Sequence, residues 1–584
     1  MLKEHKLKFT WLNPPLPPKR DRRRRKADQK PAKQPQLQPT PLQSFQDLRS
    51  RYGLADELVS NVLEQGFDVP TEVQLGAIPL LLDTSALHLD EAKDLDNPEN
   101  GTVNGLDLLA IAPTGSGKTL AFLIPLLHRL REERSRDAGK DRNTSAIVLA
   151  PTRELASQTV NEGRKLARST GLRITQMRKG MKFQADDLPH EANDPTGNHG
   201  ASESTVKADI IVSTPGVLQS ALFNTNNVQA LEFVRHLVLD EADVLLDPLF
   251  RNQTLDIWKS LRNSSLRVSM WSATMGSNIE ELARATIDGR RKLLSEQSGT
   301  TVMEVPLIRL VVGLKDSAVP NVQHKLTYAA TEQGKLMGLR QLLHPAATSG
   351  DSETPLRPPF LVFTQTIERA VALHAELLYD IPAEAGGIGR IAVLHSDLSD
   401  TARDAVMTRF RKGEVWVLIT TDLLSRGVDF CGVNGVVNYD IPTSSAAYVH
   451  RIGRTGRAGR SGGVAVTLYS KEDIPYLKHV ANVVAMASRQ GGKGTGMDQW
   501  LLDALPKLSK NEKQNLKKRG VESRTARGTQ KDPRAARKSQ ISSKSGYDRR
   551  LENKRKGAIA GSRRAVQAGH ESDEDRESDF EGFD

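Results

Sequence analysis

Residues 112–119 read Ala112-Pro113-Thr114-Gly115-Ser116-Gly117-Lys118-Thr119, directly after the apolar run Leu108-Leu109-Ala110-Ile111. The two glycines let backbone N–H groups approach phosphates, Lys118 adds a positive charge, and the Thr119 hydroxyl is a ligand suited to Mg²⁺. A turn between a strand and a helix that binds nothing is the alternative, because a loose match to this pattern occurs by chance in many proteins. The stretch predicts a phosphate-binding loop for a nucleoside triphosphate at the end of a strand.

Two carboxylates follow a second apolar run. Asp240 and Glu241 come directly after Leu237-Val238-Leu239. At a strand end beside a phosphate loop, one carboxylate is expected to hold the metal with Thr119 and the other to activate the attacking water. We assign the first role to Asp240 and the second to Glu241. A turn without a ligand does not explain this pair.

A third stretch, 450–457, reads His450-Arg451-Ile452-Gly453-Arg454-Thr455-Gly456-Arg457. An arginine-rich stretch is more often a solvated or nucleic-acid-binding face, but arginines at fixed spacing also stabilise a transferring phosphoryl group. Together with the phosphate loop, this stretch predicts an ATPase whose site is divided between two domains.

Composition sets outer limits on the function. The 584 residues exceed what one core supports, so more than one domain is expected. No stretch approaches the roughly 18 to 20 apolar residues of a membrane span, so no membrane partner is expected. The net charge of +11 favours a polyanionic partner, although a solvated surface satisfies it equally well. The single cysteine, Cys431, excludes an intrachain disulfide and a zinc site with several thiolates.

Short apolar runs alternate with helical patterns in two successive regions, which predicts two α/β domains, each with a parallel sheet covered by helices. In the first region the runs include residues 108–111, 146–149, 210–212, 237–239 and 268–271, and in the second 360–363, 391–394, 415–419, 435–439 and 464–468. We place the first domain at 44–314 and the second at 321–488, with hydrophilic surface insertions near 83–103 and 185–205. Residues 1–43, which are rich in Pro, Gln and Lys, are expected to be disordered. The basic tail 489–584, which ends in an acidic run, is expected to be largely disordered because it has few apolar residues, apart from the short stretch Trp500-Leu501-Leu502-Asp503-Ala504-Leu505.

With these features in place, the chain resembles the DEAD-box RNA helicases from about Phe45 to Tyr476. The resemblance rests on Gly66-Phe67, Pro70-Thr71 and Gln74, on Pro151-Thr152-Arg153-Glu154-Leu155-Ala156, Gly180 and Thr214-Pro215-Gly216, on Ser272-Ala273-Thr274, and in the second region on Phe363-Thr364, His395-Ser396, Thr421-Asp422 and Arg426-Gly427-Val428-Asp429. It implies two tandem RecA-like domains, ATP and Mg²⁺ as cofactors, RNA as the partner, and a monomer. It also implies binding to RNA phosphates and riboses without sequence preference, with short duplexes melted by strand bending.

The resemblance assigns further roles to single residues. Gln74 is implied to read the adenine, and Asp429 belongs to a motif that faces RNA and ribose. Arg454 and Arg457 are implied to approach the γ-phosphate when the domains close, and His450 to couple to Asp243. Closure then gates hydrolysis.

Three positions depart from the family pattern. Val217 replaces a common arginine, Lys179-Gly180 replaces a glycine pair, and Asp400 stands where a glutamine usually precedes Arg403. These changes remove polar groups that face RNA, so weak intrinsic unwinding and dependence on the tails or on partners are expected.

A finer resemblance points to the fungal mitochondrial DEAD-box helicases implicated in assembly of the large ribosomal subunit, and hence to ribosomal RNA and a mitochondrial location. The basic run Lys19-Arg20-Asp21-Arg22-Arg23-Arg24-Arg25-Lys26 equally resembles a nuclear signal or an RNA-binding arm, so a nuclear or nucleolar helicase of ribosome biogenesis stays open. An ATP-gated RNA clamp or assembly scaffold is the alternative of another class. A DNA helicase is disfavoured by the motif set.

Overall fold

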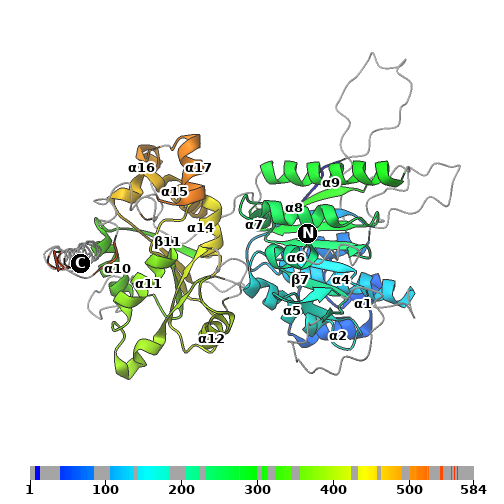
Figure 1. The fold of residues 1–584 in the computed structure, drawn as a ribbon, viewed down its shortest axis with the longest axis horizontal. Coiled ribbons are helices and arrows are strands. Elements are labelled where there is room, and N and C mark those ends of the chain that lie inside the picture. Colours follow the sequence, from blue (N-terminus) through cyan, green and yellow to red (C-terminus); the bar gives the residue numbers. More distant parts are fainter. Residues whose placement is uncertain are drawn as a thin grey trace, which may run out of the picture.

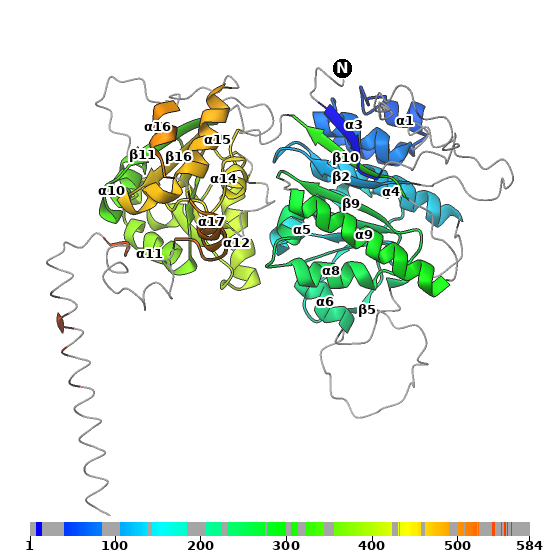
Figure 2. The ribbon, with the colours of Figure 1, turned by 90° about the horizontal axis from the view of Figure 1, so that it is seen from above.

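The computed structural model describes residues 7–13, 40–83, 105–136, 143–183, 205–223, 231–274, 277–298, 305–313, 322–343, 356–422, 430, 432–456, 462–489, 499–506, 508–521, 524 and 540–542, with isolated positions beyond. Two α/β domains lie side by side (Figures 1 and 2). The predicted fold class, two tandem parallel-sheet domains, is confirmed. The segments 84–104 and 184–204, which contain most of the expected insertions, lie outside the described residues.

The first domain is built on an eight-stranded sheet. Its strands are, in spatial order, β1 (Leu7–Trp11), β10 (Leu307–Val312), β2 (Asp107–Ile111), β9 (Arg267–Ser272), β8 (His236–Asp240), β3 (Ala146–Leu149), β7 (Ile210–Ser213) and β4 (Ile174–Gln176). Only the β1–β10 pair in this sheet is antiparallel. The central strands are mostly buried because helices cover both faces of the sheet. A separate pair, β5 (Lys182–Phe183) with β6 (Thr205–Val206), lies outside this sheet.

Two core clusters fill the two faces of this sheet. One gathers buried side chains of α1 (Asp47–Tyr52), α2 (Asp56–Glu64), α3 (Glu72–Leu82), α4 (Lys118–Arg136) and α5 (Arg153–Leu166). The other gathers those of α6 (Pro215–Phe223), α7 (Ala242–Leu245), α8 (Arg251–Ser260) and α9 (Ser277–Ser298). Because the strands are parallel, the loops that follow them meet at one edge of the sheet.

The second domain has a six-stranded sheet in which every pairing is parallel. The strands are β11 (Val322–Tyr328), β16 (Gly463–Tyr469), β15 (Gly435–Asn438), β12 (Phe360–Thr364), β14 (Val417–Thr421) and β13 (Ile391–Leu394). The helices are α10 (Glu332–Leu343), α11 (Ile367–Leu377), α12 (Asp400–Arg411), α14 (Ser445–Ile452) and α15 (Lys478–Arg489), with 3₁₀ turns at Ala383–Ala385, Gly387–Arg390 and Lys471–Tyr476. Among the described residues, no helix combines the length and apolar character that a bilayer crossing requires.

The expected disorder of residues 1–43 is wrong at its start and its end. Leu7 and Trp11 are buried in β1, which covers the edge of β10, and Leu42 is fully buried in the core. Phe9 packs so closely on α3 that a Cβ at Gly76 would lie 3.1 Å from its ring. The alternation of Leu7, Phe9 and Trp11 is a strand signal, but the basic, proline-rich composition around it obscured the pattern.

In the tail, one helix falls on the apolar stretch 500–505, which was set apart from the expected disorder, and a second helix over residues 510–519 lies where disorder was expected. Two helices, α16 (Gln499–Ala504) and α17 (Lys510–Arg519), follow the second domain, and α16 packs on α15 through Leu502. The side chain of Lys478 donates a hydrogen bond to the carbonyl of Leu505 (2.7 Å). Because an isolated helix of this length is marginal in water, α16 depends on the core that Leu502 and Leu505 join.

Candidate active site between the two domains

The predicted phosphate loop connects β2 to α4. Gly115 and Gly117 have positive φ angles of 74° and 86°, which side chains rarely tolerate. A Cβ on Gly117 would also lie 2.5 Å from Nε2 of Gln74. Lys118 is buried, and its ammonium donates to the carbonyls of Ala112 (3.1 Å) and Pro113 (3.2 Å). The loop thus curls around the cation that is assigned to the phosphates.

Gln74 supports this loop from α3. Its Oε1 accepts from the backbone N of Thr71 (2.9 Å) in a capping box, and its Nε2 donates to the carbonyl of Gly117 (3.1 Å). The hydroxyl of Thr71 donates to the carbonyl of Ser116 (2.6 Å). The implied reading of adenine by Gln74 stays a prediction, while the structure adds a role for Gln74 in fixing the phosphate loop.

The carboxylates lie where β8 ends. Glu241 has left-handed backbone angles (φ 53°, ψ 53°), unusual for a residue with a side chain and frequent at functional sites. Burial, and then the charge of Glu241, raise the pKa of Asp240 to about 7, against the opposing charge of Lys118. A divalent cation at this point would favour the ionised carboxylate. Among the described residues, the buried Glu241 Oε2 has no hydrogen-bond partner.

The donor set fits ATP with Mg²⁺. Thr119 and Asp240 offer a hydroxyl and a carboxylate, the oxygen ligands that Mg²⁺ prefers, and both line the same cleft. Within the described part of the chain, the buried Ser116 hydroxyl also lacks a partner. Unsatisfied buried polar atoms are costly, so the site is suited to a polar ligand.

The second domain supplies its catalytic candidates from α14 and the turn that follows it. His450 is buried, with Nε2 3.2 Å from Asp243 Oδ2 and 3.2 Å from the Thr274 hydroxyl. Its Nδ1 lies 3.8 Å from Glu241 Oε2. The coupling of His450 to Asp243 that the resemblance implies is therefore present, and it extends to the proposed water-activating carboxylate.

Arg454 continues this contact. Its side chain is buried and its Nε donates to the carbonyl of His450 (3.1 Å), which fixes the base of the guanidinium. The Thr114 hydroxyl of the phosphate loop donates to the carbonyl of Gly453 (3.3 Å). A Cβ on Gly453 would lie 1.8 Å from that hydroxyl oxygen, so only glycine permits this approach. Arg457 and Asp429 lie outside the described residues.

These residues line one cleft of about 860 Å³. The first domain contributes Phe67, Thr114, Gly115, Gly117, Lys118, Thr119, Asp240 and Glu241, and the second contributes Phe430, Asn434, Arg454, Thr455 and Gly456. Phe430 and Asn434 were not predicted, since neither belongs to a charged or glycine-rich pattern. The cleft thus joins the candidate phosphate, metal, water-activating and arginine groups that lie far apart in the sequence.

A second contact between the domains involves Asp400. The sequence analysis interpreted Asp400 as the loss of a glutamine that faces RNA. Asp400 pairs with Arg153 of the first domain (Nη1–Oδ1 2.6 Å) and with Arg403. Arg403 in turn donates to Glu154 (2.9 Å). The hydrogen bond from Arg403, and then the charge of Arg153, hold the pKa of Asp400 below its usual range. The substitution therefore adds a cross-domain ion pair to a segment implied to bind RNA.

Comparisons with known proteins agree with this arrangement. The sequence matches the DEAD/DEAH box helicase family over residues 99–282 and the helicase conserved C-terminal domain over residues 339–459. It is 55% identical to the ATP-dependent RNA helicase rok1 of Aspergillus terreus over 92% of this chain and 73% of that protein. It is 50% identical to the ATP-dependent RNA helicase ROK1 of Gibberella zeae over 99% of this chain and 84% of that protein. These names give no support to the expected resemblance to mitochondrial large-subunit helicases.

Solved structures share the fold. S. cerevisiae Dbp5 bound to RNA and ADP BeF3 matches with a TM-score of 0.53 and 25% identity, covering 80% of this chain and 98% of that one. The DEAD-box helicase Mss116 bound to ssRNA and UDP-BeF matches with a TM-score of 0.59 and 21% identity, covering 81% of this chain and 84% of that one. Both matches extend over both domains.

Proposed function

Since this chain belongs to the DEAD-box family of ATP-dependent RNA helicases, we propose that ATP and RNA bind across its two domains and that closure and reopening of the cleft remodel or separate short RNA duplexes. The observation that carries the proposal is the contact of His450, Gly453 and Arg454 with the nucleotide-binding groups of the first domain.

Each cleft residue has a task in this mechanism. Lys118 and the backbone of the phosphate loop bind the phosphates, and Thr119 and Asp240 hold Mg²⁺, which neutralises phosphate charge when bound. Glu241 orients the attacking water and accepts its proton, while His450 keeps that carboxylate region aligned through Asp243. Arg454 places a positive charge beside the transferring phosphoryl group and stabilises its negative charge, but only when the second domain is docked.

The RNA is proposed to lie along segments of both domains that include Arg153 and Thr364, with contacts to phosphate and ribose. The relatives are named as RNA helicases, and the Dbp5 and Mss116 structures contain RNA. Ribosomal RNA in an assembling particle is our proposal for the substrate, bound by a monomer. The net charge of +11 supports a polyanionic partner of this kind.

For the compartment we propose the nucleus or nucleolus in preference to the mitochondrion. The basic run at residues 19–26 is compatible with a nuclear signal. Imaging a tagged full-length protein beside nucleolar and mitochondrial markers tests this assignment, and exclusive mitochondrial signal would contradict it.

The ATP-gated clamp is the second candidate. The Arg153–Asp400 and Glu154–Arg403 pairs add attraction between the domains, which favours a long-lived closed state. Comparing the rate of duplex separation with the lifetime of the ATP-bound RNA complex distinguishes the two activities. A lifetime much longer than the time of strand separation would favour the clamp.

The decisive experiment measures ATP hydrolysis by the full chain with and without RNA, for the native sequence and for Gly453→Val. We expect RNA to accelerate hydrolysis in the native protein and Gly453→Val to lose that acceleration, because its side chain would collide with Thr114. Equilibrium ATP binding should change little, since the first domain holds the phosphates. Absence of RNA stimulation in the native chain would refute the proposed function.

A further inference from the structure

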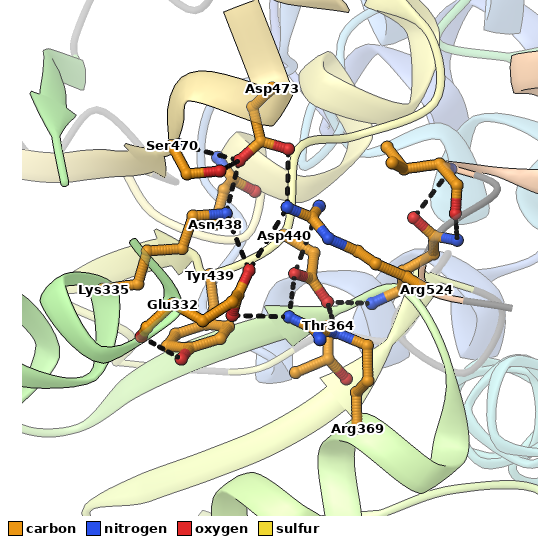
Figure 3. A network of polar contacts seen from close by, with 12 residues as sticks. Glu332, Lys335, Thr364, Arg369, Asn438, Tyr439, Asp440, Ser470, Asp473 and Arg524 are labelled. Carbon is orange, nitrogen blue, oxygen red and sulfur yellow. Dashed lines mark hydrogen bonds and ion pairs between the residues drawn. The ribbon is translucent and has the colours of Figure 1, made fainter. Parts of the chain in front are cut away.

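A buried network of six charged side chains lies in the second domain (Figure 3). Its acids are Glu332, Asp440 and Asp473, and its bases are Lys335, Arg369 and Arg524. Five of these residues come from the helicase domain. Arg524 comes from the tail, 65 residues beyond the end of the helicase C-terminal match (524 − 459).

Arg524 balances the charge of this network. Its side chain has 0% exposure and contacts Asp473 (2.6 Å), Asp440 (3.3 Å) and Glu332 (3.4 Å). Without it, three buried acids would face only two bases. Leaving a buried charge without its partner is strongly unfavourable, so the domain requires this tail residue to complete its interior.

Asp440 connects Arg524 to the loop at Gln365. One carboxylate oxygen of Asp440 accepts hydrogen bonds from the backbone N of Gln365 (2.9 Å) and from Arg369 Nε (2.7 Å). Burial alone would raise the pKa of Asp440, but the guanidinium groups of Arg369 and Arg524 hold it below its usual range. Asp440 therefore remains a carboxylate that fixes the backbone at Gln365.

The tail also holds the side chain of Gln365 directly. Gln365 Oε1 accepts from the backbone N of Val521 (2.9 Å), and its Nε2 donates to the carbonyl of Val521 (3.1 Å). Gly520 has φ 69° and ψ −158°, a region available almost only to glycine. A Cβ there would lie 2.3 Å from Gln365 Nε2, so this pairing needs glycine at residue 520.

The loop so fixed follows Thr364 at the carboxyl end of β12, the edge of a parallel sheet where ligands bind. The proposed function places RNA against Thr364. Val521 and the buried network thus hold Gln365, the residue next to an RNA-facing position, at its side chain and at its backbone.

We propose that Arg524 is a positioning residue for RNA, acting through Asp440 and Gln365, and that Val521 and Arg524 belong to the RNA-facing side of the second domain. This inference rests on the proposed RNA-dependent ATPase function. It makes RNA engagement depend on a segment outside the matched helicase domains.

The test uses the full chain and a single-stranded polyuridylate RNA as the probe. Arg524→Gln breaks the buried network, and Gly520→Ala displaces the tail from Gln365 without changing any charge. Arg340→Gln is the matched control, because it removes an ion pair with Asp380 (2.8 Å) in the same domain. RNA-stimulated hydrolysis is titrated with RNA at a temperature where thermal unfolding shows each variant folded.

We expect the RNA concentration for half-maximal stimulation to rise about tenfold in Arg524→Gln, as loss of a hydrogen bond to a charged group implies, and to rise as well in Gly520→Ala, where a pair of neutral hydrogen bonds is lost. The rate at saturating RNA should fall much less, and the control should match the native protein. A lowered melting temperature with unchanged half-saturation would mean that Arg524 only stabilises the domain, which overturns the inference.

The two remaining outcomes are also decisive. If Arg524→Gln does not fold, Gly520→Ala alone carries the test, and native half-saturation in that variant refutes the proposal. If RNA fails to stimulate the native chain, the proposed function itself is wrong and this inference is lost with it. If RNA stimulates the native chain but the variants need more RNA for half-maximal stimulation, the proposed function stands and the inference is supported.

Discussion

At the scale of single residues, the active site depends on backbone geometry as much as on side-chain identity. Lys118 and Glu241 are assigned different tasks, and the structure gives each its own environment. Lys118 is enclosed by the carbonyls of its loop, whereas Glu241 is held in a left-handed conformation beside His450. Their separation into binding and hydrolysis is therefore testable by substitution.

Replacing Lys118 with alanine should weaken ATP binding, because the cation that faces the phosphates is lost. Replacing Glu241 with glutamine should preserve binding of ATP and RNA but reduce turnover by about 10²-fold or more, the usual contribution of a general base. Equilibrium nucleotide binding and RNA-stimulated hydrolysis measured on both variants provide the check. Normal turnover in Glu241→Gln would remove that residue from the mechanism.

The residue scale also shows what sequence alone supplies. The stretch 112–119, Asp240 and Glu241 were predicted from their positions after apolar runs, and both carboxylates line one cleft with Thr114, Gly115, Gly117, Lys118 and Thr119. The meeting of His450 with Asp243 was implied by resemblance and is present. The hydrogen bond between Gln74 and the phosphate loop was not predicted, because side-chain direction depends on how α3 packs against α4.

Elements form the next scale, and here the errors of prediction have a common cause. Composition averaged over residues 1–43 and over most of the tail predicted disorder, yet β1 and Leu42 belong to the core of the first domain and α17 is a helix. Such segments are short, so the surface on which they pack makes them stable. The sequence does not reveal that surface, whereas the apolar runs of the inner strands predict buried strands by themselves.

Deleting residues 1–13 should lower the midpoint of thermal unfolding of the first domain by several degrees. The deletion exposes the edge of β10 and removes Phe9 from its contact with α3. Deletion of residues 14–36 is the comparison, since it removes basic residues but leaves β1. Equal midpoints for the full chain and the 1–13 deletion, measured by calorimetry, would show that the strand adds no stability.

Asp107 of β2 connects this strand to its neighbour β9, because its Oδ1 accepts a hydrogen bond from the backbone N of Val268 (2.7 Å) at the start of β9. Burial raises its pKa to about 6 from an ordinary value of 3.8, despite that hydrogen bond and the charge of Arg267. The folded protein then binds more protons than the unfolded chain between these values, so this residue makes stability fall as pH rises through about 4 to 6.

Asp107→Asn keeps an oxygen acceptor for Val268 but does not titrate. The free energy of unfolding of Asp107→Asn minus that of the native protein should therefore grow by about 1–3 kcal/mol from pH 4 to pH 7. Urea unfolding at several pH values measures this difference. A difference independent of pH would mean that Asp107 ionises normally.

At the scale of the whole molecule, the proposed mechanism ties hydrolysis to the relation between the two domains. Neither domain contains a complete site: the first provides the phosphate loop and carboxylates, and the second provides His450 and Arg454. The sequence predicted this division from two distant motifs. It did not predict the Asp400–Arg153 pair, because charge complementarity across domains is visible only once the domains are placed together.

Arg454→Lys tests whether closure completes the site. A lysine provides a point charge and not the planar fork of donors, so turnover at saturating ATP and RNA should fall by about 10²-fold or more, given that arginine fingers contribute about 10³–10⁵. ATP affinity should change much less, because the first domain holds the phosphates. Hydrolysis and equilibrium nucleotide binding are measured on the same preparations.

Arg409→Lys is the matched control for that experiment, since it makes the same exchange on an exposed face of the second domain, where Arg409 donates to the carbonyl of Gly389 (2.7 Å). It should turn over at the native rate. Near-normal turnover in Arg454→Lys as well would mean that the guanidinium does not reach the transferring phosphoryl group. The arginine would then serve contact between the domains or with RNA, and the gating of hydrolysis by closure would have to rest on His450 and Glu241 alone.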